Sequence, residues 1–86
     1  MESDRQRIGY YDFKAYTEQL PSGRYQGFVL VRHHTLAGTV QTVFRAGRAT
    51  TAEENAFASA EIKTVALIRI ASEIPARYRN RLLKVA

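Results

Sequence analysis

The chain has 86 residues, of which 45% are hydrophobic and 24% are charged, and its formal net charge is +5. This composition is too apolar for a disordered segment and the length allows one compact core, so we expect a single small domain over residues 1–86. Because the chain has no cysteine, neither a disulfide nor a thiolate metal site can support this core, and association with a second copy is the natural remaining support.

The first residues, MESDRQRIG, are polar and mixed in charge. They contain no apolar run of the kind that a signal peptide needs, and no later segment reaches the roughly 18 to 20 apolar residues of a membrane-spanning helix. We therefore expect a cytoplasmic protein without a membrane span. We also expect a flexible N-terminus over residues 1–7.

Residues 8–20 alternate between two sides, with Tyr11, Phe13 and Ala15 on the apolar side. Alternation at period two with many aromatic residues indicates a half-buried strand. The PSG segment that follows predicts a turn, because proline presets one dihedral angle and glycine accepts a positive φ. Residues 24–34 then form the second strand of a predicted hairpin, and its apolar middle indicates a central strand that is covered on each face.

The TLAG segment predicts the next turn, and the alternating run TVQTVFRA at 39–46 predicts a third strand. These three strands follow one another through short turns. We therefore interpret them as a three-stranded antiparallel meander.

The hydrophobic period changes after the third strand, where a helix is expected to begin. Thr51 and Glu54 have the spacing of a capping box, and Thr50 and Glu53 offer the same pattern one residue earlier. Several alanines favour continuation of this helix. We expect it to end near Glu73, because the next residue precedes a proline and is disfavoured in a helical conformation.

Residues 62–70 leave an alternative open, since this apolar, β-branched run could by itself form a fourth strand. We favour one helix because no Gly, Pro or Asn separates the run from the capped start. Such a helix is apolar nearly all round, so one side can lie on the sheet and the remainder needs the C-terminal segment or a second subunit. We therefore predict a homodimer, and the interface candidates are Val65, Ile68, Ile70 and Ile74.

The C-terminal stretch EIPARYRNRLLKVA predicts a short helix, because Pro75 is tolerated in a first turn. Tyr78, Leu82 and Val85 recur at helical spacing and form one apolar line. The arginines at every second position spread around such a helix, so they make a poor continuous stripe for phosphates. The predicted fold class is thus α+β: a three-stranded antiparallel meander, one long helix packed on the sheet and a short C-terminal helix, in the order β-β-β-α-α.

Two adjacent histidines, His33 and His34, end the second predicted strand, where successive side chains point to opposite faces. This placement does not suit one metal sphere, and no cysteine or third histidine completes a site. The chain has no nucleophile elbow, phosphate loop or zinc-binding helix motif, and so small a domain has little room for a substrate cleft. We therefore predict no enzyme, no catalytic or metal residues, no cofactor and no small-molecule substrate.

The first functional hypothesis is a small non-catalytic interaction module that dimerises through the long helix. The alternative is nucleic-acid binding, because aromatic residues interleaved with basic ones on a sheet can stack bases and pair with phosphates. The aromatic and basic candidates are Tyr10, Lys14, Tyr16, Arg24, Arg32, Arg45, Arg77 and Arg81. The RNA-recognition signature of closely spaced aromatics after a basic residue and a glycine is absent.

Overall fold

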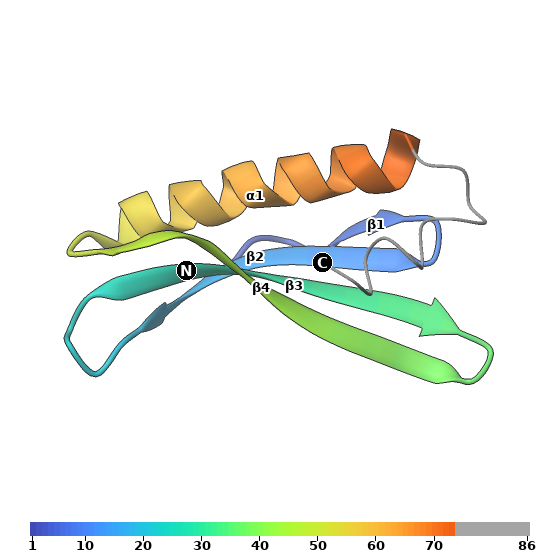
Figure 1. The fold of residues 1–86 in the computed structure, drawn as a ribbon, viewed down its shortest axis with the longest axis horizontal. Coiled ribbons are helices and arrows are strands. Elements are labelled where there is room, and N and C mark those ends of the chain that lie inside the picture. Colours follow the sequence, from blue (N-terminus) through green and yellow to red (C-terminus); the bar gives the residue numbers. More distant parts are fainter. Residues whose placement is uncertain (74–86) are drawn as a thin grey trace.

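The computed structural model describes residues 1–73, which form four strands and one helix. The elements are β1 (Gln6–Ile8), β2 (Tyr11–Gln19), β3 (Tyr25–Thr35), β4 (Gly38–Thr50) and α1 (Glu53–Glu73). The strands form one antiparallel sheet in the order β1-β2-β3-β4, and α1 crosses one face of this sheet (Figure 1). The predicted α+β class, with an antiparallel sheet and a helix packed on it, is confirmed.

The predicted number of three strands is wrong, because β1 adds a fourth strand beside β2. The chain before β1 also lies along β2: the Ser3 amide donates to the Ala15 carbonyl at 2.8 Å, and the Thr17 amide donates to the Met1 carbonyl at 3.0 Å. Residues 1–7, predicted to be flexible, therefore lie against the sheet, and their mobility stays a prediction. A strand of three residues is too short to show a period in the sequence.

The predicted β-β-β-α-α order is corrected to β-β-β-β-α for residues 1–73. The predicted short C-terminal helix, with Tyr78, Leu82 and Val85, lies outside the described residues. The alternative of a fourth strand at 62–70 is wrong, because these residues belong to α1. The described residues stop at Glu73, so the predicted end of the helix there stays a prediction. Packing of one face on the sheet keeps the β-branched run helical, since tertiary contacts override weak local propensity.

The start of α1 is tied to the sheet. The Thr50 hydroxyl donates to the Ala52 carbonyl at 2.7 Å, and the Glu53 carboxylate accepts from the Thr17 hydroxyl at 2.7 Å. The Met1 amine also donates to the Glu53 carboxylate. The hydrogen bonds from Thr17 and Met1 lower the pKa of Glu53. Glu53, which we expected to reach back to the helix cap, thus links α1 to β2.

The core lies between α1 and the inner face of the sheet. Its larger cluster joins residues of β2 and β3 to the second half of α1: Tyr11, Phe13, Val29, Val31, Leu67 and Ala71. A smaller cluster joins Ala15 of β2 and Ala46 of β4 to Ala60 in the first half of α1. The apolar side predicted for β2 is therefore the buried side.

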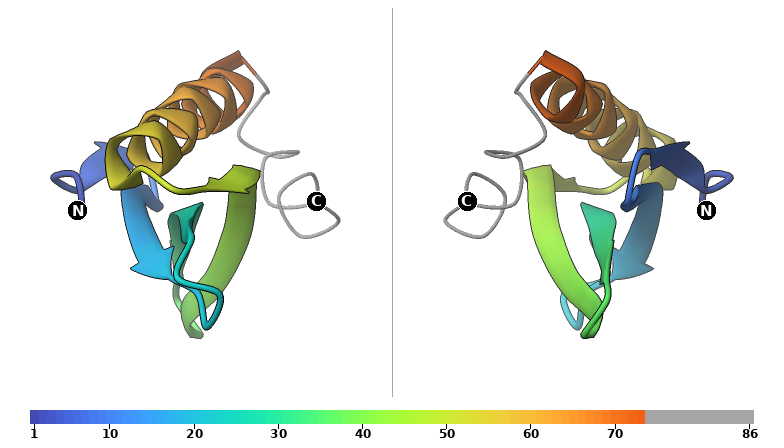
Figure 2. Two further views of the ribbon diagram at one scale, coloured as in Figure 1. Left: turned by 90° about the vertical axis from the view of Figure 1, so that its left-hand side faces the viewer. Right: turned by 90° about the vertical axis from the view of Figure 1, so that its right-hand side faces the viewer.

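Small residues allow α1 to approach β3 closely. A Cβ atom placed on Gly27 would lie 2.3 Å from the Ala56 carbonyl oxygen, a distance that the backbone must move to relieve. Ala56 and Ala60 are fully buried on the helix side of this contact. Figure 2 shows the result from both ends of the molecule: α1 covers one face of the sheet, and the described residues leave the other face open.

A bulge ends the regular pairing of β4 with β3. The register runs without interruption from Gly38 to Ala46 and shifts before Thr50, and Gly47 takes a φ of 67° there. The buried Gln26 amide donates to the carbonyls of Ala46 (2.9 Å) and Gly47 (3.1 Å). This side chain thus satisfies backbone groups at the bulge.

Candidate interaction surfaces

The inner stripe of α1, which faces the sheet, is made mostly of small residues. Its buried members recur at helical spacing and are Ala56, Ala60, Thr64, Leu67 and Ala71. The Thr64 hydroxyl donates to the Ala60 carbonyl at 2.8 Å, so this buried polar group is satisfied within the helix. The sheet therefore covers one side of α1 without leaving a polar defect.

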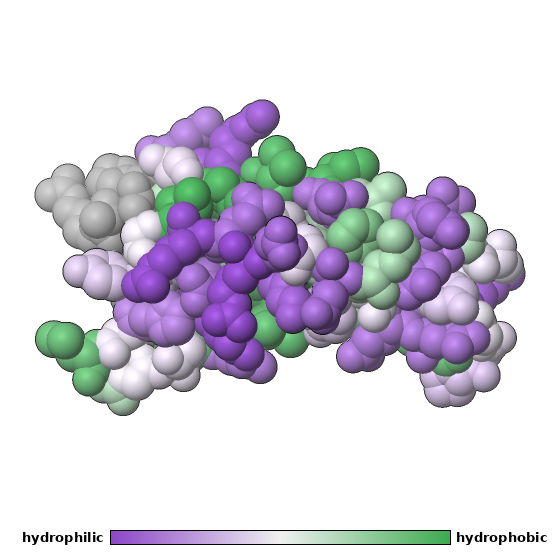
Figure 3. Space-filling view, turned by 180° about the vertical axis from the view of Figure 1, so that it is seen from behind, coloured by the Kyte–Doolittle hydropathy of each residue, from purple (hydrophilic) through white to green (hydrophobic). Residues whose placement is uncertain are grey.

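The opposite side of α1 carries large apolar side chains that are open to solvent. Ile62 is 72% exposed, Val65 is 58% exposed and Ile70 is 38% exposed. With the exposed Ala66 they form a continuous patch, which we call the outer face of α1. Figure 3, drawn from behind, shows apolar side chains along the top of the molecule over the helix, above a largely hydrophilic flank.

The dimer candidates from the sequence fall in different places. Val65 and Ile70 lie on the outer face, whereas Ile68 packs against the larger core cluster of its own chain. Ile74 lies outside the described residues. Ile62 was missed, although it stands three residues before Val65, a spacing that places these two side chains on one helical face.

Two exposed charges of opposite sign lie along the outer face. Glu61 and Arg69 stand four residues before and four residues after Val65, so the three side chains follow one ridge of the helix. If a second helix packs antiparallel about Val65, each Glu61 comes opposite the partner's Arg69. The outer face is therefore self-complementary in charge as well as apolar.

The open face of the sheet collects half of the nucleic-acid candidates. The strand register places four of them there: Lys14, Tyr16, Arg32 and Arg45. Tyr16 stacks on Phe28 of β3 with ring centroids 5.4 Å apart, and Phe28 stands opposite Arg45 of β4. An aromatic pair with basic neighbours thus lies on a surface that the described residues do not cover.

Acidic groups moderate the charge of this open face. Lys14 Nζ lies 3.1 Å from Glu2 Oε2, an exposed ion pair of small energy. Arg32 Nε donates to Gln41 Oε1 at 3.1 Å. Burial raises the pKa of Tyr16, and the nearby Glu18 carboxylate raises it further. The phenol is therefore neutral at physiological pH.

Two further nucleic-acid candidates, Tyr10 and Arg24, do not join this surface. Tyr10 lies in the turn between β1 and β2 and is 70% exposed, and Arg24 lies in the loop between β2 and β3. Arg77 and Arg81 lie outside the described residues. The structure thus separates one sheet cluster from two isolated side chains.

The two histidines point to opposite faces of the sheet, as predicted. His33 stacks on Tyr11 with centroids 4.5 Å apart, while His34 Nε2 lies 2.6 Å from Oδ2 of the buried Asp12. The other ring nitrogen of His34 lies 3.2 Å from the Thr39 hydroxyl. The hydrogen bond with His34 holds the pKa of Asp12 below its usual value, although burial opposes this shift. His34 therefore joins β2, β3 and β4 at this end of the sheet.

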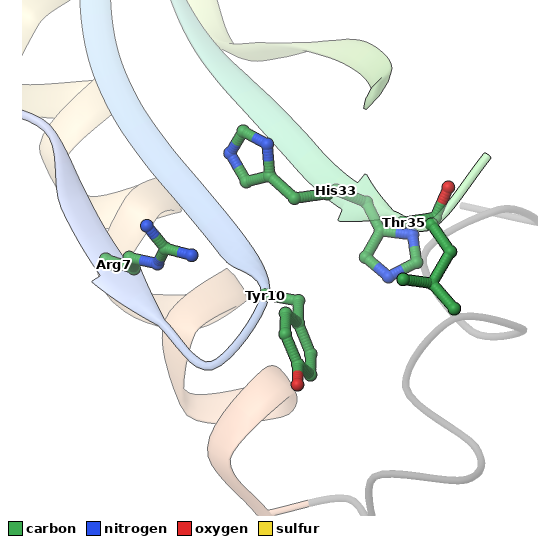
Figure 4. A pocket seen from close by; sticks show the side chains of 6 residues that line it. Arg7, Tyr10, His33 and Thr35 are labelled. Carbon is green, nitrogen blue, oxygen red and sulfur yellow. The ribbon is translucent and has the colours of Figure 1, made fainter. Parts of the chain in front are cut away.

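A pocket of about 580 Å³ adjoins the histidines, and Figure 4 shows side chains from β1, the β1–β2 turn and the end of β3 around it. Its lining residues are Arg7, Tyr10, His33, His34, Thr35 and Leu36. Among residues 1–73, no cluster of three or more His, Asp or Glu side chains could hold a metal ion. Both ring nitrogens of His34 already have protein partners, the Asp12 carboxylate and the Thr39 hydroxyl.

The sequence matches no protein-family model, and neither the curated proteins nor the solved structures give a match. Among residues 1–73, no helix combines the length and the apolar character that crossing a membrane requires. The described residues present two candidate interaction surfaces: the outer face of α1 and the open face of the sheet.

Proposed function

We propose that this chain is a small, non-catalytic cytoplasmic interaction module that forms a homodimer through the outer face of α1. The observation that carries this proposal is the exposure of Ile62, Val65 and Ile70 on a helix whose other side already packs on the sheet. A contiguous exposed apolar patch with charged residues at its border is typical of a protein–protein contact.

The energetic reason for association is burial of this patch. Complete burial of one Val, Leu or Ile side chain is worth about 1.5–3 kcal/mol, and a two-fold contact buries each side chain twice. Part of that gain offsets the translational and rotational freedom that association removes. Ala66 lies beside Ile62 and Val65, and its small side chain allows a partner helix to approach closely.

A second copy suits the outer face because of its charge pattern. Around a two-fold axis near Val65, an antiparallel partner brings Glu61 of each chain opposite Arg69 of the other. Such exposed pairs contribute only about 0.2–1 kcal/mol, so they determine orientation more than affinity. A partner without this pattern would leave both charges unpaired at the border of an apolar contact.

Charge substitutions on the outer face test the proposal by light scattering. We expect Ile62→Glu and Val65→Glu to remove the contact through the outer face and so to lower the mass of the assembly, because each would place a carboxylate in that contact. The matched control is Leu36→Glu, which alters an equally large and fully exposed apolar residue in the β3–β4 turn and leaves the dimer intact. Circular dichroism checks that each variant is folded. An assembly mass that is unchanged in the folded Ile62→Glu, Val65→Glu double variant would contradict the proposal.

The open sheet face supports a second candidate function, nucleic-acid binding. The supporting observation is that the register gathers Lys14, Tyr16, Arg32 and Arg45 on one uncovered surface. Aromatic rings on a sheet can stack on unpaired bases, and the basic residues can contact phosphates. Single-stranded oligonucleotides are therefore the class of ligand that this surface would bind.

Salt dependence separates this candidate from non-specific attraction to a basic protein. Binding to a mixed-sequence oligonucleotide is expected to weaken with a linear log–log slope as salt rises. Arg32→Ala and Arg45→Ala should each reduce that slope by about 1, because each removes a side chain that pairs with one phosphate. Arg24→Ala, which alters a loop arginine away from this cluster, is the control. No binding at low salt would dispose of the candidate.

A further inference from the structure

One edge of the sheet is long and open. β4 has 13 residues and, among residues 1–73, pairs only with β3, so the opposite side of the strand has no partner strand there. The other edge strand, β1, has three residues. An unpaired edge presents a row of backbone donors and acceptors to any strand that can align with it.

The hydrogen-bond pattern shows which backbone groups of β4 point outward. The His34 amide donates to the Tyr10 carbonyl at 2.8 Å, so the backbone groups of His34 face β2. Because these directions alternate along an antiparallel strand, those of His33 and Val31 face β4 and meet Val40 and Thr42 there. The intervening residues of β4 therefore present their N–H and C=O groups to the free edge: Thr39, Gln41, Val43 and Arg45.

This edge lacks the features that usually prevent pairing. The regular part, Gly38–Ala46, contains no proline and only one charged residue, Arg45. The bulge at Gly47 comes after it, so the pairing register with β3 is uninterrupted over nine consecutive residues. Val43 is also exposed, as is Val40.

We propose that the free edge of β4 pairs antiparallel with β4 of a second copy, around a two-fold axis at Thr42, and joins the two sheets into one. This register uses the whole regular segment, because Gly38 then lies opposite Ala46 of the partner copy. Thr39 meets Arg45, and Gln41 meets Val43, so all outward backbone groups are matched. Four such residue pairs make about eight new backbone hydrogen bonds.

The side chains of β4 fit this pairing with themselves. On the face that bears α1, Val40 lies opposite Phe44 of the other copy, an aromatic and β-branched pair of the kind that stabilises sheets. On the open face, Arg45 lies opposite Thr39, so no like charges meet. Self-complementarity about Thr42 is the reason to choose a second copy over an unrelated strand as the partner.

This contact is separate from the contact through the outer face of α1. It uses backbone groups at a sheet edge, whereas the helix contact uses side chains of Ile62 and Val65. A chain that forms both contacts assembles past the dimer, and loss of either one leaves a dimer held by the other. Failure of one proposal is therefore distinguishable from failure of the other.

Cysteine cross-linking tests the register directly, since the natural chain has no cysteine. In Thr42→Cys the two thiols face each other across the axis, in a pair whose Cβ atoms are about 4.5–5.5 Å apart. In the control Gln41→Cys, the two thiol-bearing residues are diagonal neighbours at about 7–8 Å, beyond disulfide reach. Mild oxidation is expected to give at least about tenfold more disulfide-linked dimer in Thr42→Cys. Equal cross-linking in the two variants would overturn the proposal.

A proline variant supplies a second readout. Val43→Pro removes an outward N–H without removing a hydrogen bond to β3, so the fold is expected to stay intact while edge pairing weakens by about tenfold or more. The helix variant Val65→Glu, introduced into Thr42→Cys, is expected to leave the cross-link unchanged. Unaltered association of a folded Val43→Pro chain, or loss of the cross-link with Val65→Glu, would show that β4 does not form this contact.

Discussion

The two sides of α1 differ in a way that reverses the usual arrangement of a surface helix. Four of the five buried residues on its inner stripe are alanine or threonine, whereas the outer face carries Ile62, Val65 and Ile70 in contact with solvent. A surface helix normally places its larger apolar residues on the sheet. Here the small residues bring the helix close to Gly27, and the larger apolar side chains stay exposed.

This comparison separates two kinds of apolar residue. Leu67 fills space in the core and is expected to stabilise the monomer, while Ile62 is exposed and is expected to act on the proposed association instead. Hydrophobicity alone does not distinguish them. Matched substitutions on the two sides of α1 test whether they really differ in this way.

The largest effect is expected from truncation on the inner stripe. Leu67→Ala should lower the free energy of unfolding by about 2–5 kcal/mol, because it removes buried methyl groups and leaves a cavity between the helix and the sheet. Ile62→Ala on the outer face should change it by less than about 0.5 kcal/mol when the chain is monomeric. Urea unfolding followed by circular dichroism at low protein concentration measures both. Similar losses in the two variants would remove the distinction between the sides.

Enlargement of an alanine should show the same asymmetry with a smaller effect. Ala60 is fully buried, so Ala60→Leu overpacks the contact with the sheet and should cost about 1–3 kcal/mol. Ala58 is exposed on the outer side, and Ala58→Leu is expected to be nearly neutral. Thermal melts of the pair provide the comparison. A stable Ala60→Leu would mean that α1 packs loosely on the sheet.

The smallest effect concerns the Asp12–His34 pair, which lies on neither side of α1. Because folding lowers the pKa of Asp12, its carboxylate contributes stability above the unfolded-state pKa, and this contribution is lost as the pH falls through the folded-state value, below about pH 4. Asp12→Asn should therefore reduce stability at neutral pH and flatten the acid side of the pH profile.

A double-mutant cycle with His34→Ala isolates this contact. If the hydrogen bond between the two side chains is the main cause of the pKa shift, the double variant should be hardly less stable than either single variant. Chemical unfolding of the unaltered chain and the three variants gives four free energies of unfolding at pH 7 and four at pH 3.5. If the losses of stability in the two single variants were fully additive in the double variant, the lowered pKa of Asp12 would have another cause.

The sequence predicted the parts of this fold that have a long, regular pattern. Alternation identified β2 and its buried side of Tyr11, Phe13 and Ala15, and the capping pattern marked the start of α1 to within a few residues. β1 was missed because three residues show no period. β4 extends past Ala46 because the bulge at Gly47 breaks the alternation without ending the strand.

The candidate surfaces were predictable only in part. The apolar character of α1 was clear, but a helix that is apolar nearly all round does not reveal which side the sheet covers. Ile68 was therefore grouped with Val65, although it packs on its own core. The distinguishing signal was the spacing of alanines at 56, 60 and 71, which marks the side of close approach. The outward backbone groups of β4 depend on pairing register, which a single sequence does not encode locally.

The most direct measurement is sedimentation equilibrium of the unaltered chain from the low to the high micromolar range. We predict a reversible, concentration-dependent rise in mass above the 9.7 kDa of one chain, which the Ile62→Glu and Val65→Glu substitutions reduce. A single species of 9.7 kDa at every concentration would contradict self-association through the outer face of α1.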